Sequence, residues 1–228
     1  MSYAGFDTYS CPDIGMMQWL KNNTNLSFCG FYLGGAPCHR DAGWMGTYNV
    51  LAAQGWGMAA IYVGQQEPGN NCGANTLTAD QGNTDGQQAT SLMGAANAGF
   101  PIGSVVYLDI EAGGPASAQT KAYYKAWVDA VFAGGLYRPG VYCSYTTAPS
   151  LLEVRNAAQV WATRLLAVPD GGYSNPFGTD DPVNSGVNAA TVWQYAQNQD
   201  VDFAGAPTPT LHIDLNFASV SDPSAPPI

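Results

Sequence analysis

Residues 105–112 read Val-Val-Tyr-Leu-Asp-Ile-Glu-Ala, an apolar run that ends in two carboxylates, Asp109 and Glu111. Such a run is typical of a strand that is buried on both faces, as in parallel sheets covered by helices. Side chains alternate across a strand, so Asp109 and Glu111 point to the same face. Because an unpaired buried carboxylate is costly, this pair requires cations, a hydrogen-bond network or a chemical purpose.

Seven further strand-like runs accompany this one. The expected strands are 4–7, 28–33, 58–63, 104–110, 139–144, 159–165, 191–196 and 211–216. Helix-compatible stretches follow the first five strands, at 12–22, 44–54, 86–98, 118–133 and 148–156. After the sixth strand the helical pattern stops. Five strand–helix units followed by three bare strands predict an α/β fold, a modified TIM-like barrel. The last strands are expected to pair antiparallel, since they lack helical crossovers.

The chain length bounds the number of domains. A chain of 228 residues fits one domain, which we expect to cover residues 1–220 as a single barrel. Residues 221–228 are rich in proline and show no apolar period, so we expect a flexible, dispensable tail. There is no run of about 18 apolar residues, so no membrane span is expected.

Composition narrows the possible partners. The net charge is −10 with seven Lys and Arg, which argues against binding to nucleic acid or anionic membranes. Charged residues make up 11% of the chain, below the usual share of about a quarter. This composition suits an extracellular or cell-wall-associated protein, although residues 1–7 show no signal peptide. No nucleotide-binding glycine motif or zinc-ligand spacing occurs, so neither a cofactor nor a metal is expected. We also expect a monomer.

The chain has five cysteines, so at least one has no partner within it. Cys38 and Cys72 follow strand-like runs and lie in polar loops, which makes them the expected disulfide. Cys29 and Cys143 lie within apolar strand-like runs and are expected to be buried thiols. A disulfide would indicate an oxidising compartment.

Two more acids lie in the first and last predicted strands. Asp7 ends the first, and Asp214 lies in the last. If the barrel closes, these strands are neighbours, and both acids converge with Asp109 and Glu111 on the rim where barrel enzymes place their chemistry. The alternatives are a helix cap or turn for Asp7 and a hydrogen-bonded strand end for Asp214.

Aromatic and amide side chains supply a second pattern near the ends of the later strands. Aromatic faces can stack on sugar rings, and a glutamine amide can bind hydroxyls. The candidate substrate-binding residues are Tyr142, Tyr145, Trp193, Gln194 and Tyr195. Core packing is the alternative for each, and it is the favoured interpretation for Trp161.

The order of these motifs resembles a known family. GFD, YLDIEA, GVYCSY, VWQYAQ and IDLNFA are similar to motifs of glycoside hydrolase family 25, the Chalaropsis-type lysozymes. The segments AGFDTYSCPD and CGFYLGG more closely resemble the glycoside-hydrolase-like family typified by a secreted mycobacterial protein. The true lysozymes usually carry Trp-Gln shortly after the first Asp, where this chain has Ser10-Cys11-Pro12-Asp13.

The resemblance, which runs from Gly5 to Phe217, implies a (β/α)5(β)3 barrel with an acidic pocket at the carboxyl ends of its strands. Glu111 would be the general acid and Asp109 its partner, with Asp7 and Asp214 lining the pocket. Asp109 and Glu111 are too close on one strand to flank a glycosidic bond from both faces. The attacking group would then be a substrate acetamido group, or a water activated by Asp7 or Asp214.

Two hypotheses follow for function. The first is a glycosidase that acts on a cell-wall glycan such as peptidoglycan, and the second is a non-catalytic glycan-binding module that retains the carboxylate pocket.

Overall fold

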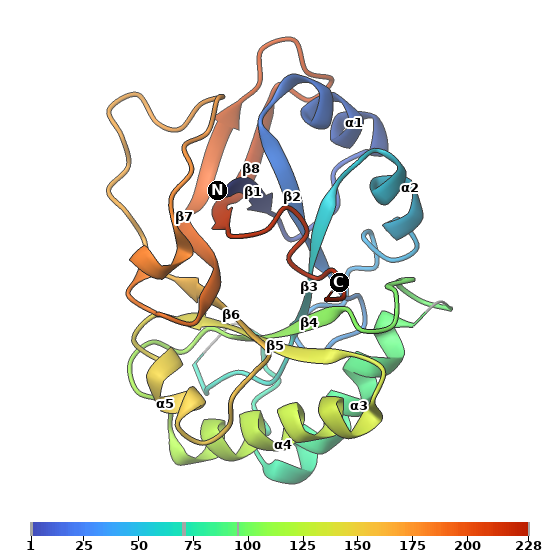
Figure 1. Ribbon diagram of the computed structural model, residues 1–228, viewed down its shortest axis with the longest axis vertical. Helices are drawn as coiled ribbons and strands as arrows, with labels where there is room; N and C mark the ends of the chain where they lie inside the picture. The colour runs from blue at the N-terminus through green and yellow to red at the C-terminus, as the bar shows by residue number, and fades with distance from the viewer. Residues whose placement is uncertain (1, 70–71, 95, 228) are drawn as a thin grey trace.

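The computed structural model describes residues 2–69, 72–94 and 96–227, whose strands form one closed barrel in chain order (Figure 1). The predicted α/β, TIM-like barrel is thereby confirmed. The strands are β1 (Tyr3–Asp7), β2 (Leu26–Tyr32), β3 (Gly57–Val63), β4 (Val105–Ile110), β5 (Arg138–Ser144), β6 (Gln159–Thr163), β7 (Ala190–Asp202) and β8 (Thr210–Ala218).

One α-helix follows each of the first five strands, as predicted. The helices are α1 (Ile14–Asn23), α2 (Tyr48–Ala53), α3 (Ala79–Met93), α4 (Ala118–Gly134) and α5 (Ala148–Leu152). A 3-10 turn, η1 (Pro182–Ser185), lies between β6 and β7. No helix in the described ranges has the length and apolar character that crossing a bilayer requires.

Helix α3 begins seven residues before its predicted start at residue 86. The Thr78 hydroxyl caps it by accepting a hydrogen bond from the backbone N–H of Gln81. Gly82 and Gly86 lie inside the helix, where a Cβ would come within 2.3 Å of the Tyr123 carbonyl and 2.7 Å of the Trp127 carbonyl. These glycines therefore allow α3 to approach α4 closely, instead of marking a turn.

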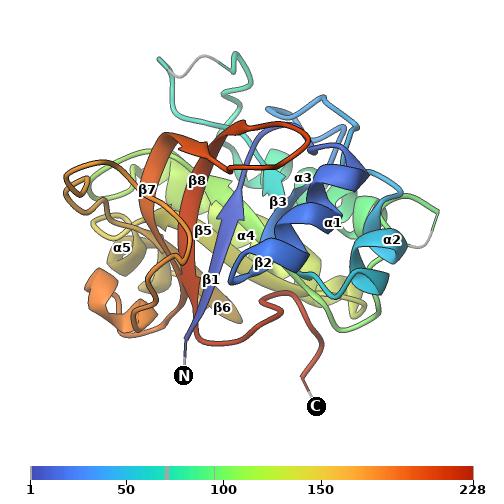
Figure 2. The ribbon, with the colours of Figure 1, turned by 90° about the horizontal axis from the view of Figure 1, so that it is seen from above.

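The expected antiparallel pairing holds for one strand of the last three. β8 runs antiparallel to both β7 and β1, whereas β7 runs parallel to β6. The parallel β6–β7 connection is made by a long loop containing η1, so this crossover needs no α-helix. The β7–β8 hairpin extends over the carboxyl ends of the strands, opposite the two chain termini (Figure 2).

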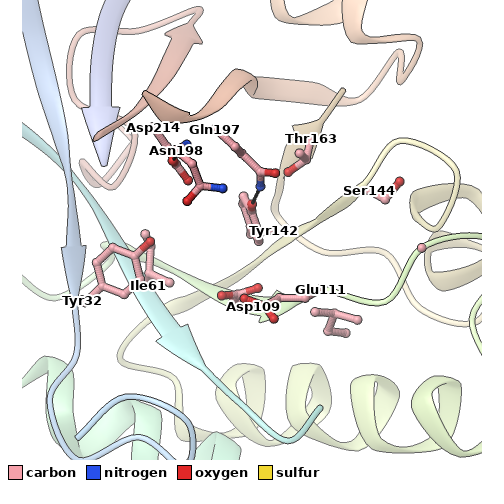
Figure 3. A pocket seen from close by; sticks show the side chains of 12 residues that line it. Tyr32, Ile61, Asp109, Glu111, Tyr142, Ser144, Thr163, Gln197, Asn198 and Asp214 are labelled. Atoms are coloured by element: carbon pink, nitrogen blue, oxygen red, sulfur yellow. Dashed lines mark hydrogen bonds between the residues drawn. The ribbon is translucent and has the colours of Figure 1, made fainter. Parts of the chain in front are cut away.

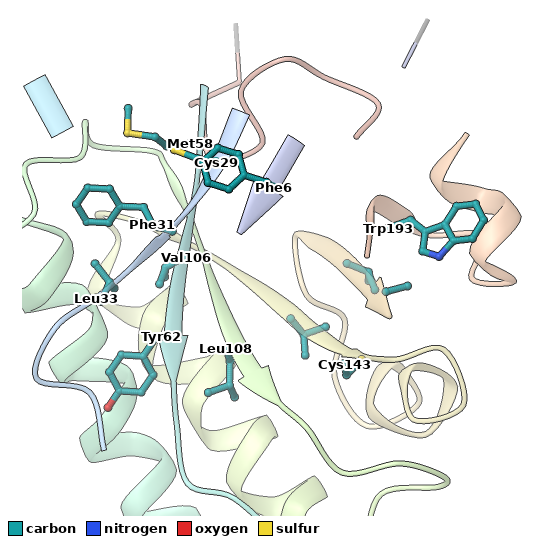
Figure 4. Packing of buried hydrophobic residues seen from close by; sticks show 14 of the residues in the cluster. Phe6, Cys29, Phe31, Leu33, Met58, Tyr62, Val106, Leu108, Cys143 and Trp193 are labelled. Carbon is teal, nitrogen blue, oxygen red and sulfur yellow. The ribbon is translucent and has the colours of Figure 1, made fainter. Parts of the chain in front are cut away.

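The barrel separates two apolar layers. Outward-facing strand residues pack beneath the helices, among them Tyr62, Val106 and Leu108 (Figure 4). A smaller cluster fills the interior, where Tyr107 and Trp161 meet edge to face at 5.6 Å. The core assignment of Trp161 is confirmed. This interior packing closes the amino-terminal part of the barrel and leaves polar side chains to the carboxyl end.

Within the expected flexible tail, residues 222–224 instead pack against the barrel. Ser224 is 1% exposed and joins the amino ends of β3 and β4. Its hydroxyl donates to the Val105 carbonyl at 2.7 Å and accepts from the Ala60 N–H at 2.8 Å, and its carbonyl accepts from the Val105 N–H at 3.0 Å. The Asp222 carboxylate accepts from the Met58 N–H at 3.0 Å. The segment thus satisfies strand groups that would otherwise be unpaired.

The Cys38–Cys72 disulfide is confirmed, with the two Cα atoms 5.2 Å apart. It joins the segments that follow β2 and β3. Cys29 and Cys143 are buried free thiols, as expected, and Cys11 is a partly buried free thiol.

Candidate active site

A pocket of about 560 Å³ opens at the carboxyl ends of the barrel strands (Figure 3). Its volume lies in the range of about 300–1,000 Å³ that is usual for ligand sites. The side chains that line it include Tyr32, Asp109, Glu111, Tyr142, Ser144, Thr163, Gln197, Asn198 and Asp214. Neither lysine nor arginine occurs among these lining residues, all of which lie in the described part of the chain.

Asp109 and Glu111 lie together on one wall, as their spacing predicted. Asp109 is 5% exposed, whereas Glu111 lies at the exposed mouth of the pocket. Gln66 fixes the backbone between them: its Nε2 donates to the Asp109 carbonyl at 2.9 Å, and its Oε1 accepts from the Glu111 N–H at 3.0 Å. The buried Gln66 extends the pairing of β4 beyond the end of β3 and so orients both acids.

Asp214 faces this wall from the opposite side of the barrel, because β4 and β8 lie four strands apart in the closed ring. Its Oδ1 accepts from the Asn198 N–H at 2.6 Å, and its Oδ2 accepts from Gln194 Nε2 at 2.9 Å. The pocket therefore has carboxylates on two facing walls.

Asp7 lies beneath the pocket and does not line it, contrary to the expectation from the sequence. It is 2% exposed, and its carboxylate accepts three side-chain hydrogen bonds. The donors are the Tyr32 hydroxyl at 2.7 Å, Asn216 Nδ2 at 2.7 Å and Gln194 Nε2 at 3.1 Å. Asp7 thus holds together the polar layer that forms the pocket floor.

Asp7→Ala is expected to lower the free energy of unfolding by about 2 kcal/mol or more, because it leaves buried donors without an acceptor. Thermal or denaturant unfolding measures the effect. Asp170→Ala, at an exposed loop carboxylate, is the matched control and should unfold like the parent. Equal stability of the two variants would contradict the role assigned to Asp7.

The pKa values of the four clustered carboxyl groups are all raised above their ordinary values. Burial raises the pKa of Asp109 well above its usual range, and the neighbouring charges of Glu111, Asp7 and Asp214 raise it further. Burial is also the main cause that raises the pKa of Asp214 to about 7 and the pKa of Glu111 above its ordinary value. For Asp7, burial raises the pKa more than its hydrogen bonds lower it. These pKa shifts favour retention of protons in the cluster above the ordinary carboxylate range.

Asp109→Asn is expected to leave the melting temperature at pH 7 unchanged or to raise it. No donor in the described residues reaches the buried Asp109 Oδ1, so the substitution removes a charge without removing a hydrogen bond there. A raised folded-state pKa means that the parent loses stability as pH rises from about 4 through that pKa. The gain from Asn should therefore vanish in acid.

The matched control for this variant is Asp85→Asn. Asp85 is also buried, but it accepts from Tyr123 at 2.7 Å and from Gln81 at 2.7 Å, so its substitution should be destabilising. The measurement is the melting temperature of both variants and of the parent from pH 4 to pH 8. A large loss of stability in Asp109→Asn at pH 7 would show that Asp109 is a structural acid.

Of the five predicted substrate-binding residues, only Tyr142 is among the described residues that line the pocket. Tyr142 lines it and donates its hydroxyl to Gln194 Oε1 at 2.7 Å. Gln194 is 1% exposed and bridges Asp7 and Asp214 in the floor. Tyr145 does not line the pocket; it is 39% exposed and lies over Arg164.

Trp193 and Tyr195 do not reach the pocket, and their prediction as substrate-binding residues is corrected. They are 2% and 3% exposed in the outer apolar layer. Tyr195 stacks on Phe217 at 3.9 Å, and Trp193 Nε1 donates to the Arg164 carbonyl at 2.8 Å. Because neighbours on a strand point to opposite faces, the inward position of Gln194 turns both rings outward.

Several site residues were missed in the sequence, namely Tyr32, Gln66, Gln197, Asn198 and Asn216. Strand alternation could have identified Asn216, which lies two positions after Asp214 on the same face. Gln66 follows β3 in a loop, and no periodic signal marks it.

The fold is a closed α/β barrel with an acidic pocket at the carboxyl ends of its strands. The model of the Rv2525c-like, glycoside hydrolase-like domain matches residues 18–217, and the chain belongs to this family. No curated protein matches the chain.

Solved structures share the fold. An uncharacterized protein of B. stearothermophilus has a TM-score of 0.61 at 18% identity, with 95% of this chain and 96% of that chain covered. The spore cortex lytic enzyme SleM of Clostridium perfringens has a TM-score of 0.59 at 15% identity, with 95% and 67% covered. A muramidase of Acremonium alcalophilum has a TM-score of 0.54 at 14% identity, with 96% and 94% covered.

Proposed function

We propose that this protein hydrolyses glycosidic bonds of a cell-wall glycan, with peptidoglycan as the leading candidate. The observation that carries the proposal is the pair of facing acidic walls, Asp109 and Glu111 on β4 and Asp214 on β8, in a pocket without cationic lining residues. The usual scheme of glycoside hydrolysis uses a proton donor and a second carboxylate on opposite sides of the scissile bond.

Each acid has a distinct role in this proposal. Glu111, at the open mouth, donates its proton to the leaving oxygen as the glycosidic C–O bond breaks. Asp214 receives a proton from the water whose oxygen attacks the sugar carbon. When ionised, Asp109, beside Glu111, stabilises the positive charge that develops on the sugar ring. Asp7 does not touch substrate and instead positions Tyr32, Gln194 and Asn216.

Three further observations support a glycan substrate outside the cytoplasm. The similar structures include a spore cortex lytic enzyme and a muramidase, which are proteins of that substrate class by name. The Cys38–Cys72 disulfide suits an oxidising compartment. Tyr142 offers an aromatic face on the pocket wall to a sugar ring.

The test is incubation of the purified protein with peptidoglycan and a panel of other polysaccharides, followed by measurement of new reducing ends. New reducing ends from peptidoglycan, absent with the Glu111→Gln protein, are the expected result. Binding to peptidoglycan without any new reducing ends would replace this proposal with a non-catalytic glycan-binding module.

A further inference from the structure

A second cavity, of about 470 Å³, adjoins the acidic pocket and has Glu111 in common with it. Its other walls include Tyr9, Val63, Gln66 and the Cys38–Cys72 disulfide. Glu111 therefore lies between two cavities, and the proposed proton donor can reach a bond that spans them. The disulfide fixes one wall, since it ties the segment after β2 to the segment after β3.

Tyr9 is the aromatic surface of this second cavity. Its side chain is 56% exposed, yet one side of its ring faces two other rings. The ring centroid lies 4.4 Å from that of the fully buried His39 and 6.5 Å from that of Tyr32. The backbone beside it is fixed as well, because Trp44 Nε1 donates to the Thr8 carbonyl at 3.3 Å. An exposed aromatic ring that is packed on one side is suited to stack on an apolar sugar face at little entropic cost.

The charges of the residues that line the cavities disfavour negatively charged glycans. Among the described residues that line the two cavities, Asp109, Glu111 and Asp214 carry the titratable carboxylates, and neither Lys nor Arg is present. Asp109 and Asp214 line only the first cavity, so a uronate or sulfate group placed there would meet carboxylates without a compensating cation. Val63 and the disulfide offer an apolar wall, which fits a neutral ring and its acetamido methyl group.

We propose that the cavity beside the disulfide is a second sugar-binding site, which takes the uncharged ring on the other side of the bond held at Glu111. The proposal rests on the proposed glycosidase function and adds to it a requirement for at least two neutral rings, stacked in part on Tyr9.

The experiment measures binding of β-1,4-linked N-acetylglucosamine oligomers, from monomer to hexamer, by calorimetry in a Glu111→Gln background that does not cleave them. Affinity should rise with length until both cavities are filled. Tyr9→Ala should lower the affinity for the longer oligomers about 2- to 10-fold and leave monomer binding unchanged. Tyr9→Phe should keep the affinity of its background for every length. Oligogalacturonates of equal length should bind more weakly than the neutral oligomers.

Phe132→Ala, at an exposed aromatic residue of α4 outside both cavities, is the matched control. A Tyr9→Ala variant that binds every length as its background does, or that loses affinity equally for monomer and hexamer, would overturn the second site. Cleavage of peptidoglycan by the parent alongside that result would leave the proposed function intact. Length-dependent binding that requires Tyr9, without cleavage by the parent, would instead overturn catalysis alone.

Discussion

Glu111→Gln is expected to lower the rate of glycan cleavage by about 10²–10⁴-fold, the usual contribution of a positioned general acid. Gln has nearly the same shape as Glu but carries no proton to donate at the glycosidic oxygen. The measurement is the release of reducing ends from peptidoglycan at saturating substrate, with glycan binding followed separately. Binding should persist, because the lining residues of both cavities are otherwise unchanged.

Folding should not account for this loss of activity. Glu111 is exposed at the pocket mouth, and the structure records no hydrogen bond to its side chain within the described ranges, so Gln should melt at or above the parent temperature. Asp170→Ala serves as the matched control for removal of an exposed acid and should retain full activity. A Glu111→Gln protein that still cleaves at the parent rate would exclude Glu111 as the proton donor.

Removal of residues 222–228 is expected to lower the free energy of unfolding by about 3 kcal/mol or more. The backbone N–H groups of Met58, Ala60 and Val105 would lose their acceptors at once, and each unsatisfied buried group costs about 1–3 kcal/mol. For a chain of this length the melting temperature should fall by at least about 6 °C. Thermal unfolding followed by circular dichroism measures the change.

Two controls locate the cause. A chain that ends after Pro226 keeps Asp222 and Ser224 and should melt close to the parent. Ser224→Ala removes only the hydroxyl that bridges Ala60 and Val105, so its loss should be intermediate. A chain lacking 222–228 that melts with the parent would show that this segment does not hold β3 and β4 in solution.

The sequence by itself determined the barrel and one wall of its pocket. The apolar run from Val105 to Ile110 identifies a strand that is buried on both faces, and alternation places Asp109 and Glu111 on one side of it. The helical pattern after the first five strands and its absence later define the (β/α)5(β)3 order. These features depend on neighbours in the chain, so local periodicity carries them.

Closure of the barrel decided the features that depend on distant partners. Alternation shows that Trp193 and Gln194 face opposite sides, but only the register of β7 against β6 and β8 decides that Gln194 faces inward. Asp7 ends its strand as predicted, yet its burial depends on Tyr32, Gln194 and Asn216, which come from three other strands.

The packing of α3 on α4 explains Gly82 and Gly86, which lie inside the helix where a Cβ would meet the α4 backbone. The proline-rich end has no apolar period, and unpaired N–H groups on β3 and β4 fixed it in place. In each case the deciding partner lies far along the chain. Such a partner satisfies a buried polar group or fills a close contact, and no local pattern records it.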